Sequence, residues 1–480
     1  MKQTIGIDAM ASYVPSTLLD LVPEERVNGE YIETEFSRSR KSAEVFKDIT
    51  NLPSYLARGI GAYQFGFVDG KQDPVTMGAM SFKKLIEEND LELSEIGRFY
   101  VGTESPVDNS KPNAMYIVGA VERLMGKKGE MINCTPLDLK FACAGATAGL
   151  ELLAEWIETG KNRGKYGVVI ATDVATYPLE SREEVTQGAG SVAMLVKENP
   201  RLIALENNMN AEITSTVSRD ERDFFRPVNR HTAVVDGPLS IECYLDTSKA
   251  ALINYRKRAI KQGLIKDGEL LTEKVNRILL HLPFHRMAEY ASVPLYVRER
   301  RNTPMWKEIE KVVGPEPKRE DVKATKIFRK KVRETEQFKE FFAEKIEKGA
   351  VAAKRTGNTY TGSLYMGLSS MLELESQQGT DLSGMRFVFG SYASGSMFKA
   401  FTGIVQPDFK EVVRELDLLK SLDKRERNRK GHLSLKDYER LHEKDLGIEE
   451  CVLEPKKEFV LANLGTSKVD EGYRYYEFVD

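Results

Sequence analysis

The sequence predicts a layered α/β fold made of two similar halves. Apolar segments of strand length alternate with amphipathic segments of helical period, a pattern typical of α/β layering and unlike an all-helical or all-strand chain. Three elements also recur in one order: a strand followed by a polar residue, small residues leading into a helix, and a strand leading into a loop of small residues. Because this order occurs twice within 480 residues, we expect an internal duplication.

The first elements of the chain are a strand, a helix and a second strand. Residues 5–15 (IGIDAMASYVP) predict a strand that Pro15 ends. Residues 74–90 carry apolar side chains along one helical face, with a proline near the start of the helix. Residues 97–105 (GRFYVGTES) predict a strand that delivers Glu104 just past its C-terminal end, where open α/β sheets place their ligands.

Two further strands complete the first half, and three similar elements follow later. Residues 165–173 predict a strand that ends at Asp173. Residues 186–196 predict a turn at Gly188 to Gly190, followed by a short hydrophobic strand. The second half repeats a strand with a polar end at His281, a helix after small residues, and a strand that runs into a Gly/Ser loop; these segments are residues 276–284, 355–374 and 386–396.

We divide the chain near residue 198. The first half, residues 1–198, carries Glu104 and Cys143, and the second half, residues 199–480, is longer because residues 298–354 are inserted. The candidate site residues of the second half are His281, Asn358 and the Gly390–Ser396 loop.

The insertion predicts a charged helix with one apolar side. Residues 329–348 (RKKVRETEQFKEFFAEKIEK) alternate charges as a solvated helix does. The side chains expected on its inner face are Val332, Phe338, Phe341 and Phe342.

The stretch around Cys143 is the centre of the predicted fold. Residues 137–141 suit a buried strand, residues 142–148 are almost all small, and residues 150–157 form a helical stripe that Gly160 ends. Cys143 therefore lies at a strand-to-helix turn. The free amides at a helix start favour a thiolate, and the small neighbours leave room for an acyl group. The alternative is a small buried residue in a core, which is the usual state of a lone cysteine.

Three polar residues accompany Cys143 at ends of predicted strands or starts of helices: Glu104, His281 and Asn358. Each has an ordinary structural explanation, as a solvated loop residue, a hydrogen-bonded histidine or a turn former. If the two halves pair about a pseudo-twofold axis, however, their strand ends meet at one place, and one active site explains all four residues together.

Around these residues the sequence resembles the hydroxymethylglutaryl-CoA synthase family of thiolase-fold condensing enzymes. The similar motifs run in the family order over nearly the whole chain: IGIDAMASYVP, VGTESPVDNSK around Glu104, ACAGATAG around Cys143, ATDVATYPLESREEVTQGAGSVAM, VDG at Asp236, HLPFHRM around His281, GNTYTGSLY around Asn358, and GSYASGS from Gly390.

The resemblance implies a thiolase-like, duplicated, five-layered αβαβα fold with an added charged helical insertion in the second half. It also implies an acyltransferase that condenses acetyl-CoA with acetoacetyl-CoA and water to give 3-hydroxy-3-methylglutaryl-CoA and CoA, in the mevalonate pathway of isoprenoid biosynthesis. Carried over to this sequence, Cys143 is the nucleophile that accepts the acetyl group, Glu104 the general acid and base, and His281 the anchor of the acetoacetyl group. The substrate-binding residues implied are Asn358, Ser396, Tyr392 and Arg286, and Asp173 and Asp236 are implied to support the site.

The sequence departs from the family pattern after His281. His285 and Arg286 stand where a small or polar residue and a lysine are usual, and we expect Arg286 to bind a CoA phosphate in place of the lysine. For the chemistry, we expect the helix start and a protonated His281 to stabilise the thiolate of Cys143. Partial burial is expected to raise the pKa of Glu104.

Composition narrows the classes of function. With 70 basic and 73 acidic residues the net charge is -3, so no overall field attracts nucleic acid. The sequence has no apolar run of membrane-spanning length and no signal-peptide pattern, and its four cysteines are widely spaced. We therefore expect a cytoplasmic protein without a metal site. The family resemblance implies CoA thioesters as substrates and no other cofactor. The family resemblance implies a homodimer.

Two alternatives to this function stay open. Another thiolase-fold condensing enzyme, such as a ketoacyl synthase or a polyketide branching synthase, would share the Cys-His-Asn set, although Glu104 favours the hydroxymethylglutaryl reaction. From a different class, the chain could be a non-catalytic acyl-CoA-binding scaffold that keeps the fold. Acetyl-CoA-sensitive labelling of the thiol separates these classes.

Overall fold

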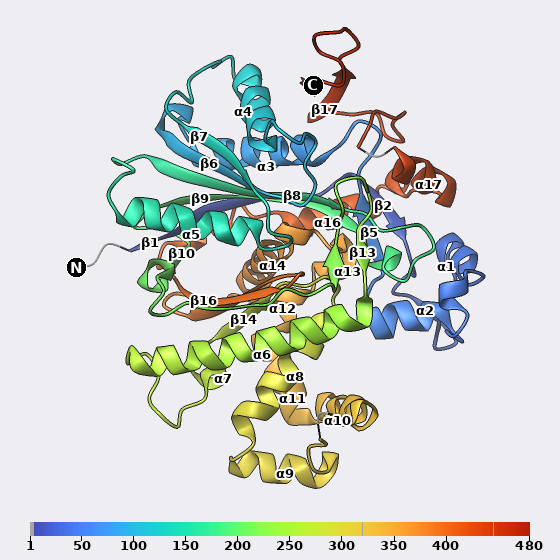
Figure 1. The fold of residues 1–480 in the computed structure, drawn as a ribbon, viewed down its shortest axis with the longest axis vertical. Helices are drawn as coiled ribbons and strands as arrows, with labels where there is room; N and C mark the ends of the chain where they lie inside the picture. Colours follow the sequence, from blue (N-terminus) through green and yellow to red (C-terminus); the bar gives the residue numbers. More distant parts are fainter. Residues whose placement is uncertain (1–3, 319, 445) are drawn as a thin grey trace.

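The computed structural model describes residues 4–318, 320–444 and 446–480 (Figure 1). Most of its strands join one mixed sheet with the order β14-β15-β16-β10-β1-β9-β8-β6-β7, with β11 paired to β16. In chain order these strands are β1 (Ile5–Tyr13), β6 (Ile96–Gly102), β7 (Thr135–Leu139), β8 (Tyr166–Ala175), β9 (Gly188–Glu198), β10 (Ile203–Leu205), β11 (Ser215–Ser218), β14 (Arg277–Leu280), β15 (Arg386–Ala393) and β16 (Met397–Val405).

The same strand pattern occurs in both halves, as the predicted duplication requires. In the first half β6 runs parallel to β8, and β8 pairs antiparallel with β9. In the second half β14 runs parallel to β15, and β15 pairs antiparallel with β16. The short strand β10 pairs with both β1 and β16, so the two sets of strands are hydrogen-bonded into one sheet. The division near residue 198 stays a prediction.

Helices cover and separate the two sets of strands, which gives five layers (Figure 1). The central layer contains α5 (Gly145–Glu158) and α14 (Ser363–Gln377). On the outside of the first set lie α3 (Pro74–Asn89) and α4 (Asn113–Leu124), and α6 (Gly237–Lys261) packs against β16 of the second set. The predicted αβαβα class is confirmed.

Local sequence explains why the helices of the first half begin where they do. Helix α3 starts at Pro74, and the side chain of the preceding Asp73 accepts a hydrogen bond from the Thr76 amide. Helix α5 starts immediately after the Cys143 turn and lies directly against β6. A Cβ atom on Gly102 would come within 2.1 Å of the Ala146 nitrogen, so only glycine allows this approach.

Strand β7 differs from the buried strand predicted at residues 137–141. It spans Thr135–Leu139 and lies at an end of the sheet order, paired with β6 alone among the described strands. Leu137 is 45 % exposed, and Phe141, just beyond the strand, is 39 % exposed. An apolar run therefore predicted the strand correctly but not its burial, because burial depends on which strand ends the sheet.

The turn predicted at Gly188 to Gly190 is wrong, because both glycines belong to strand β9. Packing between the two halves of the chain explains the glycine at position 188. A Cβ atom on Gly188 would lie 2.5 Å from the carbonyl oxygen of Thr356, so the second half approaches the strand backbone directly.

The insertion forms several helices, of which those at residues 304–313 and 322–334 project from the layers (Figure 1), whereas residues 347–350 pack against α14. The single charged helix predicted at residues 329–348 is interrupted at Thr335, whose hydroxyl caps the second of two helices. The four predicted inner side chains are all buried. The helices of this part of the chain are α8 (Met287–Arg300), α9 (Pro304–Val313), α10 (Val322–Glu334), α11 (Glu336–Lys345), α12 (Glu347–Ala350) and α13 (Ala353–Thr356).

The last segments of the chain return to the first half. Strand β17 (Glu458–Leu464) packs on α3, and its partner β18 (Arg474–Val479) packs on α4. The helices between the sheet and these strands are α15 (Phe409–Val413), α16 (Leu418–Arg427) and α17 (Leu435–Glu443).

The remaining α-helices and strands are short. They are α1 (Glu35–Arg40), α2 (Leu52–Ser54), α7 (Leu271–Lys274) and the strand pairs β2 (Thr17–Asp20) with β5 (Gln64–Phe67), β3 (Arg26–Val27) with β4 (Glu30–Tyr31), and β12 (Phe224–Phe225) with β13 (Val234–Val235). Over the three described stretches of chain, no helix combines the length and the apolar character needed to cross a membrane.

Candidate active site

Cys143 lies in the predicted strand-to-helix turn, between β7 and α5. Ala142 has a φ of 38°, in the left-handed region, and the Ala144 amide donates to the carbonyl oxygen of Phe141. This tight turn places the thiol just ahead of Gly145, the first residue of α5. A positive φ at an alanine costs conformational free energy, and strained residues of this kind are concentrated at functional sites.

The thiol of Cys143 donates a hydrogen bond to Glu104, with Sγ 3.1 Å from Oε1. Both side chains are buried. Burial raises the pKa of Glu104 to about 8, and the nearby Asp173 carboxylate adds to the rise. Burial and the charge of Glu104 together hold the pKa of the Cys143 thiol well above its ordinary value. In the unliganded protein the thiol therefore keeps its proton, and of the two groups it is the Glu104 carboxyl that titrates first.

Asp173 fixes the segment that carries Glu104. Its Oδ1 accepts from the Glu104 amide at 2.6 Å, from the Thr103 hydroxyl at 2.9 Å and from the Ser105 hydroxyl at 3.1 Å. Its Oδ2 accepts from Thr361 of the second half, through the amide at 3.1 Å and the hydroxyl at 2.5 Å. Burial raises the pKa of Asp173 to about 6 in spite of these donors. This carboxylate thus joins the two halves behind Glu104.

His281 follows β14, as predicted, and is held by its backbone. Its amide donates to the Gly390 carbonyl at 2.9 Å, and its carbonyl accepts from the Tyr244 hydroxyl at 2.8 Å. The ring is buried, and Nδ1 has no hydrogen-bond partner among the described residues. Burial lowers the pKa of His281 to about 3, so the imidazole is neutral near pH 7. The expected stabilisation of the thiolate by a protonated His281 is therefore wrong for the unliganded protein.

Asn358 lies near the thiol together with two tyrosines, one from each half of the chain. The Asn358 Nδ2 lies 3.5 Å from the Tyr177 hydroxyl, and its Oδ1 accepts from the Tyr360 amide at 2.9 Å. Both tyrosine rings belong to a buried apolar cluster that includes Cys143. The predicted nucleophile and the predicted Asn358 position are therefore brought to the same place.

The end of strand β15 contributes Tyr392, and the turn after it contributes Ser396, so the predicted Gly390–Ser396 loop begins only after Ala393. The Tyr392 hydroxyl donates to Asp223 Oδ2 at 3.0 Å, and the Gly395 amide donates to Asp223 Oδ1 at 2.8 Å. The Ser396 hydroxyl is buried without a hydrogen-bond partner in the described parts of the chain. The Tyr392 ring lies beside the His281 ring, with centroids 6.4 Å apart.

The side chains of two predicted site residues bind groups outside this site, although the Asp236 amide donates to the Asp223 carbonyl oxygen at 2.9 Å. Asp236 caps helix α6 by accepting from the Leu239 amide at 3.2 Å. Arg286 precedes α8, where its Nε donates to the Arg58 carbonyl at 2.9 Å and its Nη1 pairs with Glu289. Their predicted roles in support and in CoA binding stay predictions.

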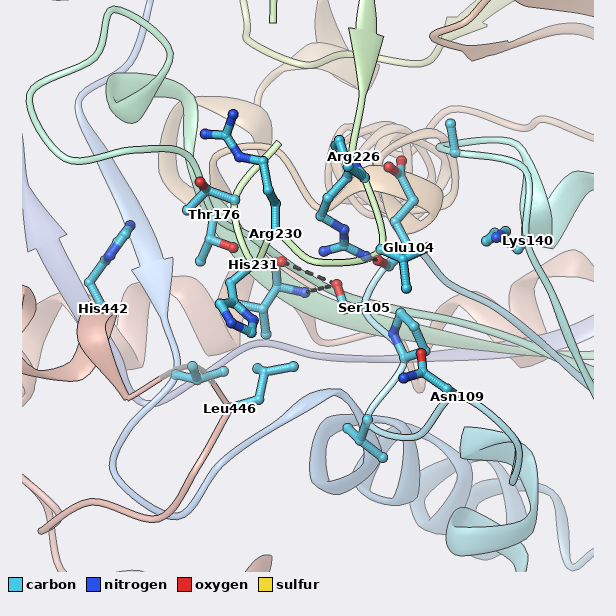
Figure 2. Close-up of a pocket in the computed structure, with 18 of the residues that line it drawn as sticks. Glu104, Ser105, Asn109, Lys140, Thr176, Arg226, Arg230, His231, His442 and Leu446 are labelled. Atoms are coloured by element: carbon cyan, nitrogen blue, oxygen red, sulfur yellow. Dashed lines mark hydrogen bonds between the residues drawn. The ribbon is translucent and has the colours of Figure 1, made fainter. Parts of the chain in front are cut away.

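A cavity of about 730 Å³ opens beside Glu104 (Figure 2). Glu104 lies at its wall, and Arg226 donates to the Glu104 carbonyl oxygen there. The cationic side chains of its lining are Lys140, Arg226, Arg230, Lys444 and Arg474. The cavity therefore approaches the Cys143–Glu104 pair from the Glu104 side. Within the described residues, no group of three or more His, Cys, Asp or Glu side chains is arranged to hold a metal ion.

Sequence reasoning missed Asp223, Tyr177 and Tyr360. Asp223 lies in an irregular stretch without helical or strand period, so no pattern singled it out, although its full burial marks it in the structure. The two tyrosines were visible inside quoted motifs, ATDVATYP and GNTYTG, but nothing local indicated that both rings face the same thiol.

A duplicated five-layered fold, with a cysteine at the start of a central helix hydrogen-bonded to a buried carboxyl group, defines a condensing enzyme of the thiolase-like class. Two family models match the chain: the N-terminal model of hydroxymethylglutaryl-coenzyme A synthase over residues 30–200 and the C-terminal model over residues 208–452. The chain belongs to the hydroxymethylglutaryl-CoA synthase family.

Individual relatives agree with this assignment. The chain is 32 % identical to the hydroxymethylglutaryl-CoA synthase of Haloferax volcanii, covering 89 % of this chain and 93 % of the relative. It is 30 % identical to that of Enterococcus faecalis, covering 91 % of each. A solved structure of MvaS in complex with 3-hydroxy-3-methylglutaryl coenzyme A has 28 % identity and a TM-score of 0.80 over the full length of both chains. These matches do not favour the two alternative functions.

The electrostatics of the pair predict how the thiol responds to removal of the carboxylate charge. Glu104→Gln should lower the pKa of Cys143, so that alkylation by iodoacetamide becomes faster at a given pH. The expected gain is roughly threefold per unit of pKa, because a less basic thiolate is also less nucleophilic. Peptide mass analysis over a range of pH measures the rate at Cys143, with Cys134 in the same sample as the control. Slower alkylation of the variant would contradict the assigned coupling.

Proposed function

We propose that this chain condenses acetyl-CoA with acetoacetyl-CoA and water to give 3-hydroxy-3-methylglutaryl-CoA and CoA, through an acetyl group on Cys143. The observation that carries the proposal is the buried contact of 3.1 Å between the Cys143 sulfur and Glu104, in a chain of this family. A thiol alone can accept an acyl group. A carboxyl group within reach of that acyl group is what carbon–carbon bond formation requires in addition.

In the first step the Cys143 sulfur attacks the carbonyl carbon of acetyl-CoA, and the thiol proton moves towards Glu104. The CoA thiolate leaves and takes up this proton from Glu104, so one thioester replaces another and Glu104 is again a carboxylate. The free amides at the start of α5 favour the developing negative charge. Because the pKa of Glu104 is about 8, its two protonation states are close in free energy near neutral pH, which suits a group that must both take and return a proton.

In the second step a base removes a proton from the methyl group of acetyl-Cys143. We assign this role to Glu104, since it already touches the sulfur that carries the acetyl group. The enolate carbon then attacks the ketone carbon of acetoacetyl-CoA, and the new alkoxide takes the proton back from Glu104. Hydrolysis of the thioester by water releases the product and restores the thiol.

His281 is assigned to orient the ketone of acetoacetyl-CoA. A neutral imidazole can donate one hydrogen bond to a ketone oxygen without placing a full positive charge in a buried site. Asn358, Tyr392 and Ser396 are assigned to the pocket around the substrates, and Asp173 to the positioning of Glu104. The buried and unpartnered Ser396 hydroxyl supports a polar contact with bound substrate.

Removal of Glu104 should separate acylation from condensation. Glu104→Ala loses the base, but it also removes the charge that raises the pKa of Cys143, so acetylation by acetyl-CoA is expected to stay within a few fold. Condensation should fall roughly 10²–10⁴-fold, the usual effect of losing a positioned acid/base. Intact-mass measurement of the acetyl adduct and a product assay test the two steps separately.

Glu104→Gln is the matched variant, because it keeps the shape but cannot take the proton. Condensation at a near wild-type rate in either variant would assign the base to another residue. A variant that folds but cannot be acetylated would show that Glu104 acts on the thiol instead.

Arg286 is proposed to contact a CoA phosphate, in keeping with its place five residues after His281. Arg286→Ala should raise the KM for CoA substrates more than it lowers kcat, as expected when uniform binding is lost. Arg298→Ala is the control, because Arg298 is exposed on the adjoining helix α8. Equal KM values in the two variants would refute the contact.

We also propose that the protein is a cytoplasmic homodimer that needs no cofactor beyond its CoA thioesters. The exposed apolar side chains Leu137 and Phe141 at the end strand β7 support pairing with a second copy through the first half. Static light scattering at micromolar concentration should give twice the mass of one chain. A mass of 54.2 kDa would contradict the dimer.

A further inference from the structure

Tyr177, whose ring belongs to the buried cluster around Cys143, lies beyond the end of the sheet. Strand β8 ends at Ala175, two residues earlier. Both backbone polar groups of Tyr177 are bound by side chains instead. Its amide donates to Gln187 Oε1 at 2.7 Å, and its carbonyl oxygen lies 2.8 Å from Nε2 of His442, which is 265 residues further along the chain. The position of this tyrosine therefore depends on two side chains.

The neighbours of His442 Nε2 identify this nitrogen as the one that carries the proton. It lies 2.8 Å from the Tyr177 carbonyl oxygen and 3.1 Å from Gln187 Oε1. The Tyr177 amide donates to the same Oε1, so that atom is an acceptor. Because both neighbours are acceptors, only an Nε2–H group satisfies them. Burial lowers the pKa of His442, so the ring is neutral near pH 7 and is the Nε2–H tautomer.

The imidazole of His442 is itself held in place. It stacks on the buried Phe67 ring, with centroids 6.1 Å apart and an angle of 5° between the ring planes. Directly after α17, the Lys444 Nζ donates to the carbonyl oxygens of Asp69 at 2.6 Å and Gln72 at 2.9 Å. These bonds fix the end of α17 to the loop before α3. His442 also lies on the wall of the cavity beside the active site (Figure 2).

The side chain of Tyr177 points into the active site. Its ring packs edge-on against Tyr360, with centroids 6.3 Å apart, in the same buried cluster as Cys143. Its hydroxyl lies 3.5 Å from Asn358 Nδ2. A shift of the Tyr177 backbone would therefore move a wall of the space beside the thiol. A displacement of about 1 Å that begins far from the reacting atoms can lower a rate roughly 10²-fold.

We propose that His442 is a positioning residue of the active site, which holds Tyr177 beside the Cys143 thiol through the hydrogen bond from Nε2–H to the Tyr177 carbonyl oxygen. Its effect on condensation rests on the function proposed above. The hold on Tyr177 and the reactivity of Cys143 are measurable without that reaction. The proposal extends the active site to α17, which follows every strand of the large sheet along the chain.

The tautomer is tested in the unaltered full chain. With isotopically labelled histidine, the nitrogen spectrum near pH 7 should show His442 in the neutral Nε2–H form. The signal is assigned by its loss in His442→Gln. The Nδ1–H form at this residue would overturn the proposal, because Nε2 could then donate to neither of its acceptors.

Two substitutions separate the hydrogen bond from the packing. His442→Phe keeps a ring on Phe67 but has no donor, whereas His442→Gln restores an N–H group at the same number of bonds from the backbone. In the Phe variant, acetylation of Cys143 and kcat for condensation should fall roughly 10–10²-fold, with KM for the CoA substrates within about twofold. The Gln variant should recover most of both rates. Lys436→Met, at an exposed position of α17, is the control and should match the wild type.

A double-mutant cycle shows whether the effect passes through Tyr177. In a Tyr177→Ala background, His442→Phe should change the acetylation rate of Cys143 less than about twofold. Losses that multiply in the double variant, or equal rates in the wild type and His442→Phe, would refute the proposal. If His442→Phe does not fold, the flexible side chain of His442→Met replaces it in the same cycle. A wild type that is acetylated but does not condense would refute the proposed function alone, since the acetylation series still tests His442.

Discussion

The contact between the buried Cys143 thiol and the buried Glu104 carboxyl is the constraint on which the rest of the site depends. Two acidic groups in a space of low dielectric cannot both be charged without a large cost in free energy. Burial raises the pKa of both groups, and the charge of Glu104 raises the pKa of Cys143 further, so the carboxyl loses its proton before the thiol does. The turn at Ala142, the approach of α5 to β6 at Gly102 and the anchoring of Glu104 by Asp173 all serve to keep these two side chains together.

The second half completes the site mainly through neutral hydrogen-bonding groups. Thr361 donates hydrogen bonds to Asp173. The hydroxyls of Tyr365 and Ser391 form hydrogen bonds of 2.8 Å and 2.9 Å with the hydroxyl of Thr147 on α5. His281 also contributes a neutral ring. Fixed dipoles of this kind can respond to charge that develops on a substrate without adding a permanent charge to the buried site.

The sequence predicted the elements that local pattern determines. The turn at Cys143, the strand ends at Glu104 and His281 and the buried inner side of the insertion all follow from periodicity and turn residues, and the structure has them in place. What it did not predict depends on distant parts of the chain. The exposure of β7 depends on where the sheet ends, and the charge state of His281 depends on how deeply the fold buries it. Asp223 could not be found because its two partners, Tyr392 and Gly395, are remote in sequence.

The return of β17 and β18 to α3 and α4 has a consequence for how the protein is made. Strands β17 and β18, which are synthesised after both sets of strands of the large sheet, complete the outer layer of the half that is synthesised first. Until then α3 lacks the cover that β17 provides, and part of its apolar surface faces water. The first half is therefore not an autonomous folding unit in synthesis order, and its final packing waits until β17 and β18 have been synthesised.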